Sequence, residues 1–248
     1  MNRVKLGFFS LTRHSERGDD RPYLEWHQLD HMPEQYPLAG IVAGQRWVST
    51  PACRAARRRD GELLGPIHYM TLYLMAEPLQ QTLQDFQALG QHLRAVGRFH
   101  EQRRARLSGP FDVTAMRAAP RVLVSDEAVA FRPNRGVYVV VREGPGTEGA
   151  TAADVGAGGG GVLAERLLEQ KGVAGVWSFS AAERFAEFGW RAGRHAVTVC
   201  FLDEEPLSVA DHLGDVVEVD ESPTAPVVFA GPFETVTPWS WGWFDGEA

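Results

Sequence analysis

The feature that most restricts the fold of this chain is an internal repeat. Several short segments occur twice, in the same order and about 120 to 135 residues apart. The pairs are SGPFDV (108–113) with AGPFET (230–235), LMAEPL (74–79) with LDEEPL (202–207), HYMT (68–71) with HAVT (195–198), and the apolar stretch VKLGFFSL near the start with GVYVVV (136–141). Because chance matches rarely agree in both order and spacing, we interpret the chain as a tandem duplication.

Hydrophobic periodicity predicts the same succession of elements in both halves, strand-helix-strand-strand-helix-strand. The elements expected in the first half are 4–11, 22–36, 40–49, 67–75, 78–97 and 111–116. Those expected in the second half are 136–142, 160–171, 173–180, 195–202, 206–214 and 227–236. A unit of this kind forms a four-stranded antiparallel sheet with both helices on one face.

We therefore predict an α+β fold of two tandem ferredoxin-like βαββαβ units. The second face of each sheet needs a cover, since a bare apolar sheet face is unfavourable, and the two antiparallel sheets can pack face to face. The first unit would span residues 1–118, a linker 119–134, and the second unit, with its tryptophan-rich tail, 135–248. A chain of 248 residues is long enough for two such domains.

Charge and composition exclude several classes of function. A net charge of −7 argues against nucleic-acid binding, which requires a basic surface. No apolar run approaches the ~18–20 residues that cross a bilayer, and the N-terminus has no secretory signal pattern. The two cysteines, Cys53 and Cys200, indicate no disulfide framework. We expect a cytoplasmic protein without a membrane or nucleic-acid partner.

The stretch WHQLDHMPEQY, residues 26–36, carries the main candidates for chemistry. On a helix, His27, His31 and Glu34 lie along one face, with Asp30 beside them. Free imidazole titrates near neutrality, and a carboxylate such as Asp30 or Glu34 could hold one ring nitrogen protonated and leave the other as a base. The competing interpretation is an ordinary solvated helix face.

A metal site is a further alternative for the same stretch. His27 and His31 at i, i+4 could share an ion, with His68 or Glu34 as a third ligand, but no ligand set of suitable spacing stands out. We predict no metal and no cofactor. Aligning the repeats on Gly40 and Gly172 puts Leu163 opposite His31, so chemistry is expected in the first half, with the second half as a scaffold.

Other polar and aromatic residues fall on the predicted strands. His68 and His195 open the third strand of the two copies, where a strand-end structural role competes with contact to a ligand. Strand aromatics are usually core residues, although some must line any pocket. The residues that we predict to contact a substrate are Arg46, Trp47, His68, Tyr73 and His195.

The duplicated unit, Trp26 before His31-Met32-Pro33, and the following PLAG turn resemble the dimeric α/β barrel superfamily, and within it the EthD-like branch. The resemblance implies a barrel built from two units with small-molecule pockets between sheet and helices. Members of this superfamily include cofactor-free monooxygenases, decarboxylases, isomerases and cyclases, and some members bind haem. The fold alone selects no reaction.

From the resemblance we expect a cofactor-independent lyase, isomerase or decarboxylase that acts on an aromatic or polyketide-like small molecule. His31 would be the general acid and base, oriented by Asp30 or His27. The alternatives are a non-catalytic ligand-binding or structural protein of the same fold, and a haem- or metal-binding member. A homodimer is compatible with all three.

Overall fold

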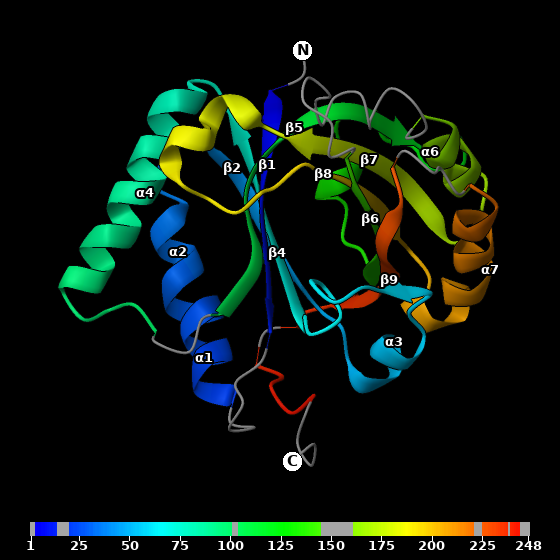
Figure 1. Ribbon diagram of the computed structural model, residues 1–248, viewed down its shortest axis with the longest axis horizontal. Helices are drawn as coiled ribbons and strands as arrows, with labels where there is room; N and C mark the ends of the chain where they lie inside the picture. The colour runs from blue at the N-terminus through cyan, green and yellow to red at the C-terminus, as the bar shows by residue number, and fades with distance from the viewer. Residues whose placement is uncertain are drawn as a thin grey trace.

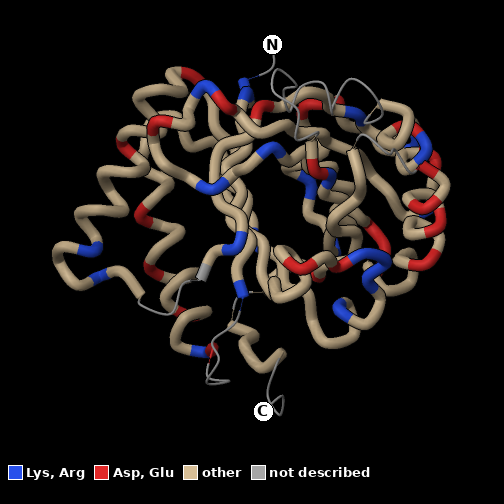
Figure 2. The backbone as a smooth tube through the Cα atoms, in the orientation of Figure 1, with Lys and Arg blue, Asp and Glu red and all other residues tan. Residues whose placement is uncertain are grey.

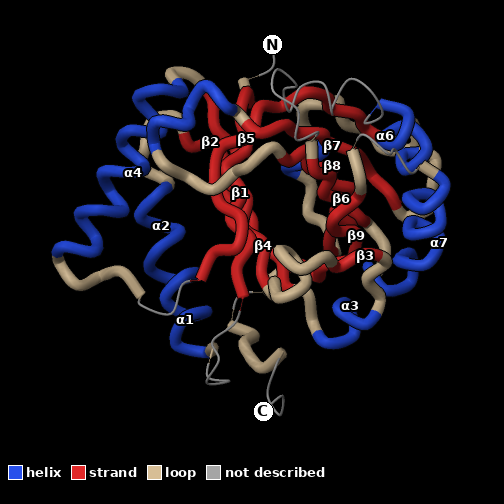
Figure 3. The backbone as a smooth tube through the Cα atoms, in the orientation of Figure 1, coloured by secondary structure: helices blue, strands red, loops and turns tan. Residues whose placement is uncertain are grey.

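The computed structural model describes residues 3–13, 20–100, 104–144, 161–220, 225–237 and 239–243. Their elements alternate as the periodicity predicts, and the helices lie outside the strands (Figures 1 and 3). The first half contains β1 (Val4–Arg13), α1 (Arg21–Glu25), the π-helix η1 (Trp26–His31), α2 (Met32–Gln35), β2 (Ile41–Val48), α3 (Pro51–Ala55), β3 (Arg59–Asp60), β4 (Tyr69–Ala76), α4 (Leu79–Ala95) and β5 (Arg104–Ala118). The second contains η2 (Val129–Phe131), β6 (Gly136–Glu143), α6 (Gly161–Leu168), β7 (Val173–Ala181), η4 (Glu183–Phe188), β8 (His195–Leu202), α7 (Pro206–Val219) and β9 (Val227–Thr235).

The two sheets close into one barrel. The described strands are ordered β2-β4-β1-β5 in the first half and β7-β8-β6-β9 in the second, which is the same relative order. Antiparallel pairing joins β5 to β7, and Trp47 and Val48 of β2 pair with Thr235 and Glu234 of β9, while short β3 adds to the outside of β9. The predicted α+β class with two ferredoxin-like units is confirmed. The units are joined at both sheet edges as well as packed through their inner faces.

Strand register places the repeated segments in equivalent positions. Thr71 on β4 is opposite Ser10 on β1, which is opposite Ser108 on β5. In the second half, Thr198 on β8 is opposite Val140 on β6, which is opposite Ala230 on β9. Each half therefore uses its copies of the HYMT/HAVT and SGPFDV/AGPFET segments at the same place in its sheet.

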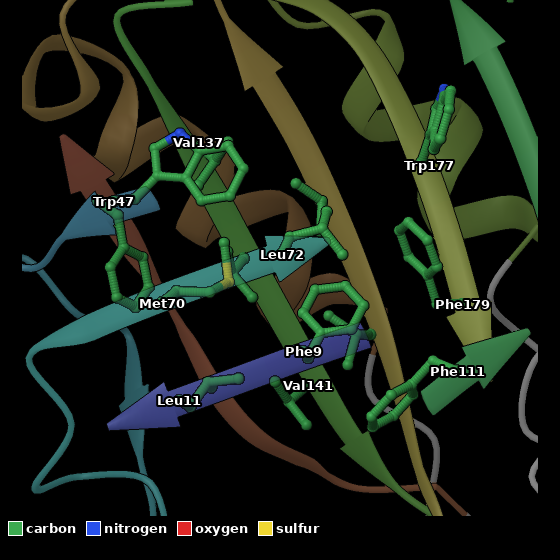
Figure 4. Close-up of a cluster of buried hydrophobic side chains, with 14 of the residues drawn as sticks. Phe9, Leu11, Trp47, Met70, Leu72, Phe111, Val137, Val141, Trp177 and Phe179 are labelled. Atoms are coloured by element: carbon green, nitrogen blue, oxygen red, sulfur yellow. The ribbon is translucent and has the colours of Figure 1, made fainter. Parts of the chain in front are cut away.

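Alternate side chains of both halves fill the barrel interior, because successive residues of a strand point to opposite faces. Figure 4 shows this cluster, in which aromatic rings of β1, β5 and β7 meet aliphatic side chains of β4 and β6. Phe9 contacts Phe111 and Phe179 edge to face, with ring centroids 5.2 and 5.0 Å apart. A core shared in this way makes the barrel one packing unit.

The segment between β5 and β6 packs into the barrel. Val129 and Ala130 are fully buried, and the Gln45 side chain donates a 2.6 Å hydrogen bond to the Ala130 carbonyl. The Trp47 indole donates to Asn134 Oδ1 at 3.0 Å, and the Trp177 indole to the Asp126 carbonyl at 2.9 Å. Val129 and Ala130, in the segment that we predicted as a linker, therefore belong to the core, while most of that segment is exposed or half-buried. That 1–118 and 135–248 are separate domains stays a prediction.

The outer faces of the two halves are covered differently. In the second half, α6 and α7 pack directly on β6 and β8, with Leu163, Leu167, Val209 and Leu213 fully or almost fully buried over Tyr138. The charged side chains of α7 are all acidic, whereas α6 carries Glu165 beside Arg166 (Figure 2). In the first half, η1, α2 and α4 leave a hollow above the sheet. No described helix is long and apolar enough to cross a membrane.

Each half also sends one connection across to the other. Helix α3, between β2 and β4, packs against β9 and α7 of the second half. The corresponding connection of the second half, η4 and the residues after it, packs against the first half, where Trp190 contacts Phe8 with ring centroids 4.9 Å apart. The outer face of the first sheet is consequently bounded by residues from both copies.

Candidate active site

A cavity of about 270 Å³ lies between the outer face of the first sheet and its helices. Its polar floor comes from β1, β4 and β5, in the side chains of Ser10, Thr71, Tyr73 and Ser108. Helices η1, α2 and α4 form its walls. Its aromatic lining consists of Phe8, Phe86, Phe99, Phe188 and Trp190. Apolar walls with a few polar groups are typical of small-molecule sites.

The π-helix η1 positions both histidines of the WHQLDHMPE stretch. The Met32 amide donates to the His27 carbonyl, five residues back, and Pro33 has no amide hydrogen to continue a regular α-helical ladder. A π-helical turn is wider than an α-helical turn, so residues four and five apart both come close. The His27 and His31 ring centroids are 5.2 Å apart, and Trp26 stacks on His31 at 4.6 Å.

Both imidazoles are buried and line the cavity. His27 is 4% exposed and His31 is 7% exposed. Tyr23 stacks beside His27 with ring centroids 5.8 Å apart, and Phe99 meets His31 edge to face at 5.4 Å. The two rings therefore face an enclosure of aromatic rings and polar side chains, in which a positioned imidazole can exchange a proton with a ligand.

The predicted carboxylate partners lie elsewhere. Asp30 is exposed and is not part of the cavity lining. Glu34 forms an ion pair with Arg98. The structure thus brings His27 and His31 together and leaves Asp30 outside the cavity.

The predicted substrate-contacting residues separate into two groups. Tyr73 lines the cavity, and Arg46 is buried beside it on β2. Trp47 points into the barrel, where it binds Asn134, and His68 is buried at the start of β4 without lining the cavity. His195 Nδ1 lies 2.8 Å from the Ala192 carbonyl oxygen.

His195 borders a different hollow. That hollow has a volume of about 360 Å³ and is lined also by Glu62, Arg106 and Glu143. The two cavities share no lining residue. His68 and His195 are equivalent in the repeat, but neither lines the cavity that holds His27 and His31.

The second half contributes more than a scaffold. Phe188 and Trp190, stacked with ring centroids 4.9 Å apart, form part of the cavity wall, and the Gln87 side chain on α4 donates to the Phe188 carbonyl at 3.0 Å. Neither residue was predicted from the sequence to belong to the site, and nor were Ser10, Gln35 and Ser108. An aromatic-rich connection that differs between the repeats, FAEFGW at 185–190, was the available signal.

A polar row crosses the first sheet below the cavity. Arg46 is opposite Thr71, and the row continues through Ser10 to Ser108. The equivalent row of the second half is Ser178, Thr198, Val140 and Ala230. The first copy therefore has polar groups and a cavity where the second has smaller or apolar groups beneath tightly packed helices.

Metal ligation receives no support within the described ranges. No group of three or more His, Cys, Asp or Glu side chains there is arranged to hold an ion. His27 and His31 are adjacent, but neither of the third ligands considered from the sequence, His68 or Glu34, lines their cavity.

Comparison with solved structures addresses the fold. An anthrone oxidase-like protein superimposes with a TM-score of 0.52 at 10% identity, over 96% of this chain and 92% of that one. The chain has the dimeric α+β barrel fold. This barrel is formed by one chain, with both units present in tandem.

Two further structures align over most of this barrel. They are a proposed monooxygenase from Fusobacterium nucleatum, with a TM-score of 0.48 at 7% identity over 96% of this chain and 94% of that one, and a proposed chlorite dismutase, with a TM-score of 0.49 at 10% identity over 94% and 95%. Compared by sequence, this barrel matches no family model and no curated protein.

Proposed function

We propose that the protein is an EthD-like enzyme that binds a planar aromatic or polyketide-like molecule in the histidine-lined cavity and moves a proton on it. His31 is the general base and acid, and His27 assists it. The observation that carries the proposal is the burial of two imidazoles, with ring centroids 5.2 Å apart, on the wall of one cavity. A positioned general base or acid typically contributes about 10²- to 10⁴-fold to a rate.

The lining favours an aromatic ligand. Aromatic rings line the cavity from several sides. The first half contributes Phe8 on β1, Phe86 on α4 and Phe99 after α4, and the second half contributes Phe188 and Trp190. Ring faces and edges bind other aromatic rings in stacked or edge-to-face geometry. A flat polycyclic ligand therefore fits this enclosure better than a sugar or a flexible polar metabolite.

The polar floor suits the oxygen atoms of such a ligand. Tyr73, Ser10 and Thr71 place hydroxyl groups on the sheet below the imidazoles. Hydroxyl donors aimed at a carbonyl oxygen stabilise the negative charge that develops when an adjacent carbon loses a proton. Proton transfer to or from a carbon atom is the step common to these reactions: lyases, isomerases and direct reaction with oxygen begin with proton removal, and a decarboxylase returns a proton to the carbon that has lost CO₂.

Oxidation is the first reaction to test, because the fold resembles that of an anthrone oxidase-like protein. His31 would take a proton from the methylene carbon of an anthrone. The resulting carbanion would react with O₂, so that one anthrone and one O₂ give one anthraquinone and one water. In this reaction the protein binds the anthrone, transfers the proton and stabilises the oxyanion, and O₂ is the oxidant.

The experiment follows anthrone oxidation by oxygen uptake and quinone absorbance. We expect His31→Gln to lower kcat by about 100-fold or more in a protein that still folds and unfolds cooperatively. His92→Gln, on the exposed side of α4, is the matched control and should keep full activity. A wild-type protein that binds anthrone without turning it over would indicate a binding protein. A visible absorption band in the purified protein would favour haem chemistry.

A further inference from the structure

The guanidinium of Arg46 is a buried charge that has no hydrogen-bond partner among the described residues. The residue is 4% exposed, and none of its three guanidinium nitrogens bonds to any group in the described part of the chain. Its nearest assigned contact is the ring of Tyr69, whose centroid is 5.9 Å from the guanidinium carbon. Burial lowers the pKa of Arg46 below its ordinary value, since hydration of the charge is lost.

Two other arginines with buried guanidinium nitrogens show what a structural role looks like in this protein. Arg142 donates to the Ala225 and Asp220 carbonyls and to the Asp220 carboxylate at 2.7 to 2.9 Å. Arg57 donates to two backbone carbonyls and to Ser49. Both guanidinium groups therefore donate their hydrogen bonds to acceptors of the protein itself. Arg46 has none of these bonds, although an unpaired buried charge destabilises a fold.

Arg46 lies next to the cavity floor in the sheet, although it is not itself a lining residue. It is directly opposite Thr71 across the β2–β4 pair, and side chains at such positions share one face of the sheet. Thr71 lines the cavity, as does Tyr73, two residues along the same strand. In the second copy, where α6 and α7 pack tightly on the sheet, the equivalent position is Ser178. The charge occurs in the copy that has the cavity.

We propose that Arg46 is an anion-binding residue of the histidine-lined cavity and that the natural ligand is an aromatic acid with a carboxylate. A guanidinium offers planar, paired donors that match a carboxylate, and the unused nitrogens of Arg46 are the donors that such a group needs. The apolar walls hold the ring system, and the carboxylate anchors one end of it at the floor. The inference rests on the proposed function only for the choice of cavity.

The test is a binding measurement that needs no turnover. Titration calorimetry compares anthracene-2-carboxylate with its uncharged primary amide, which has the same ring system. We expect the wild-type protein to bind the carboxylate at least about tenfold more tightly, because a charge-assisted pair replaces an unpaired buried charge. Arg46→Met should abolish this preference, and Arg46→Lys should keep part of it.

Arg94 provides the matched control, since it is a second arginine at the cavity. It lines the cavity, is exposed and lies over Phe99, with its guanidinium carbon 4.2 Å from the ring centroid. Arg94→Met should leave most of the carboxylate preference. If Arg94→Met removes the preference and Arg46→Met does not, the assignment to Arg46 is wrong. Equal binding of acid and amide by the wild-type protein would overturn the proposal outright.

A second readout separates anion binding from a structural role. Arg46→Met removes an uncompensated charge, so the melting temperature of the ligand-free protein should stay the same or rise. A marked fall, with the carboxylate preference intact in Arg46→Lys and Arg46→Met, would show that Arg46 supports the fold. If only the proposed proton transfer is wrong, the protein should still prefer the carboxylate to the amide in the binding measurement, but it should not turn over anthrone.

Discussion

The indole of Trp26 lies nearly flat on the imidazole of His31, with ring centroids 4.6 Å apart and an interplanar angle of 22°. The two residues are five apart in the chain, a spacing that a regular α-helix would place on different sides. The same indole donates a 3.0 Å hydrogen bond to the Arg98 carbonyl, beyond the end of α4. Trp26 therefore fixes the orientation of His31 and ties η1 to the opposite wall of the cavity.

Shortening Trp26 tests this relationship. We expect Trp26→Leu to lower both the free energy of unfolding, by about 2 kcal/mol, and turnover, by about tenfold, because ring packing and the hydrogen bond are both lost. Trp26→Phe keeps a stacking ring and should lose only about 1 kcal/mol of stability, with little change in kcat. Chemical denaturation and kinetics measure the two effects. Equal turnover in both variants would show that the stacked ring does not position His31.

Two glycines near the cavity should respond oppositely to alanine. A Cβ at Gly40, which precedes β2, would overlap the Thr82 side chain, itself held by a 2.8 Å hydrogen bond to the Pro78 carbonyl. A Cβ at Gly90, inside α4, would meet no atom within 4 Å. We expect Gly40→Ala to destabilise the protein by about 2 kcal/mol or more and Gly90→Ala to stabilise it by about 0.5–1 kcal/mol. Thermal unfolding measures both changes in stability. If both variants are stabilised, or both destabilised, the packing described here is contradicted.

The two cysteines predict a loss of stability at alkaline pH. Burial raises the pKa of Cys53 to about 11, from 9.0 in an exposed thiol, and also raises the pKa of Cys200. Between pH 9 and 11 the unfolded chain therefore binds fewer protons than the folded one, so the Cys53 contribution is full below pH 9 and is lost as pH rises toward 11. The slope is about 1.4 kcal/mol per pH unit for each thiol.

Denaturation curves between pH 8 and 11 measure this slope, and Cys53→Ala should make it shallower than in the wild-type protein. The same burial should keep both thiols unreactive toward a thiol reagent at pH 8 until the protein unfolds. Rapid labelling of Cys53 in the folded protein would contradict both expectations.

Asn134 connects the segment between the two halves to both sheets at the β2–β9 closure. Its Oδ1 accepts hydrogen bonds from Trp47 at 3.0 Å and from Thr235 at 2.7 Å, and its Nδ2 donates to Gln45 at 3.2 Å. Asn134→Ala leaves the buried Trp47 indole without its acceptor, whereas Thr235 keeps its bond to the Asn134 backbone carbonyl, and the change should cost about 2–3 kcal/mol. Asn134→Asp keeps the acceptor and should cost less. Urea denaturation compares them, and a neutral Asn134→Ala would show that the closure does not depend on this residue.

Much of the fold could be predicted from the sequence alone. The repeat and the 2.0- and 3.6-residue periodicities are local, so they indicated the two βαββαβ units and the strand that holds Tyr73. They also placed His27 and His31 on one helix. Periodicity did not reveal the π-helical turn, because that turn depends on backbone hydrogen bonds around Pro33, which the spacing of apolar residues does not specify.

Only the tertiary structure decided which candidates meet. His68 and His195 are equivalent in the repeat, yet neither reaches the cavity, and Trp190 reaches it from the other half across the closed barrel. Sequence spacing fixes which face of an element a side chain occupies. Whether that face meets a cavity, a packed helix or the barrel interior depends on how distant segments pack. That packing exposed Asp30 to solvent and buried Arg46 with no hydrogen-bond partner in the described ranges.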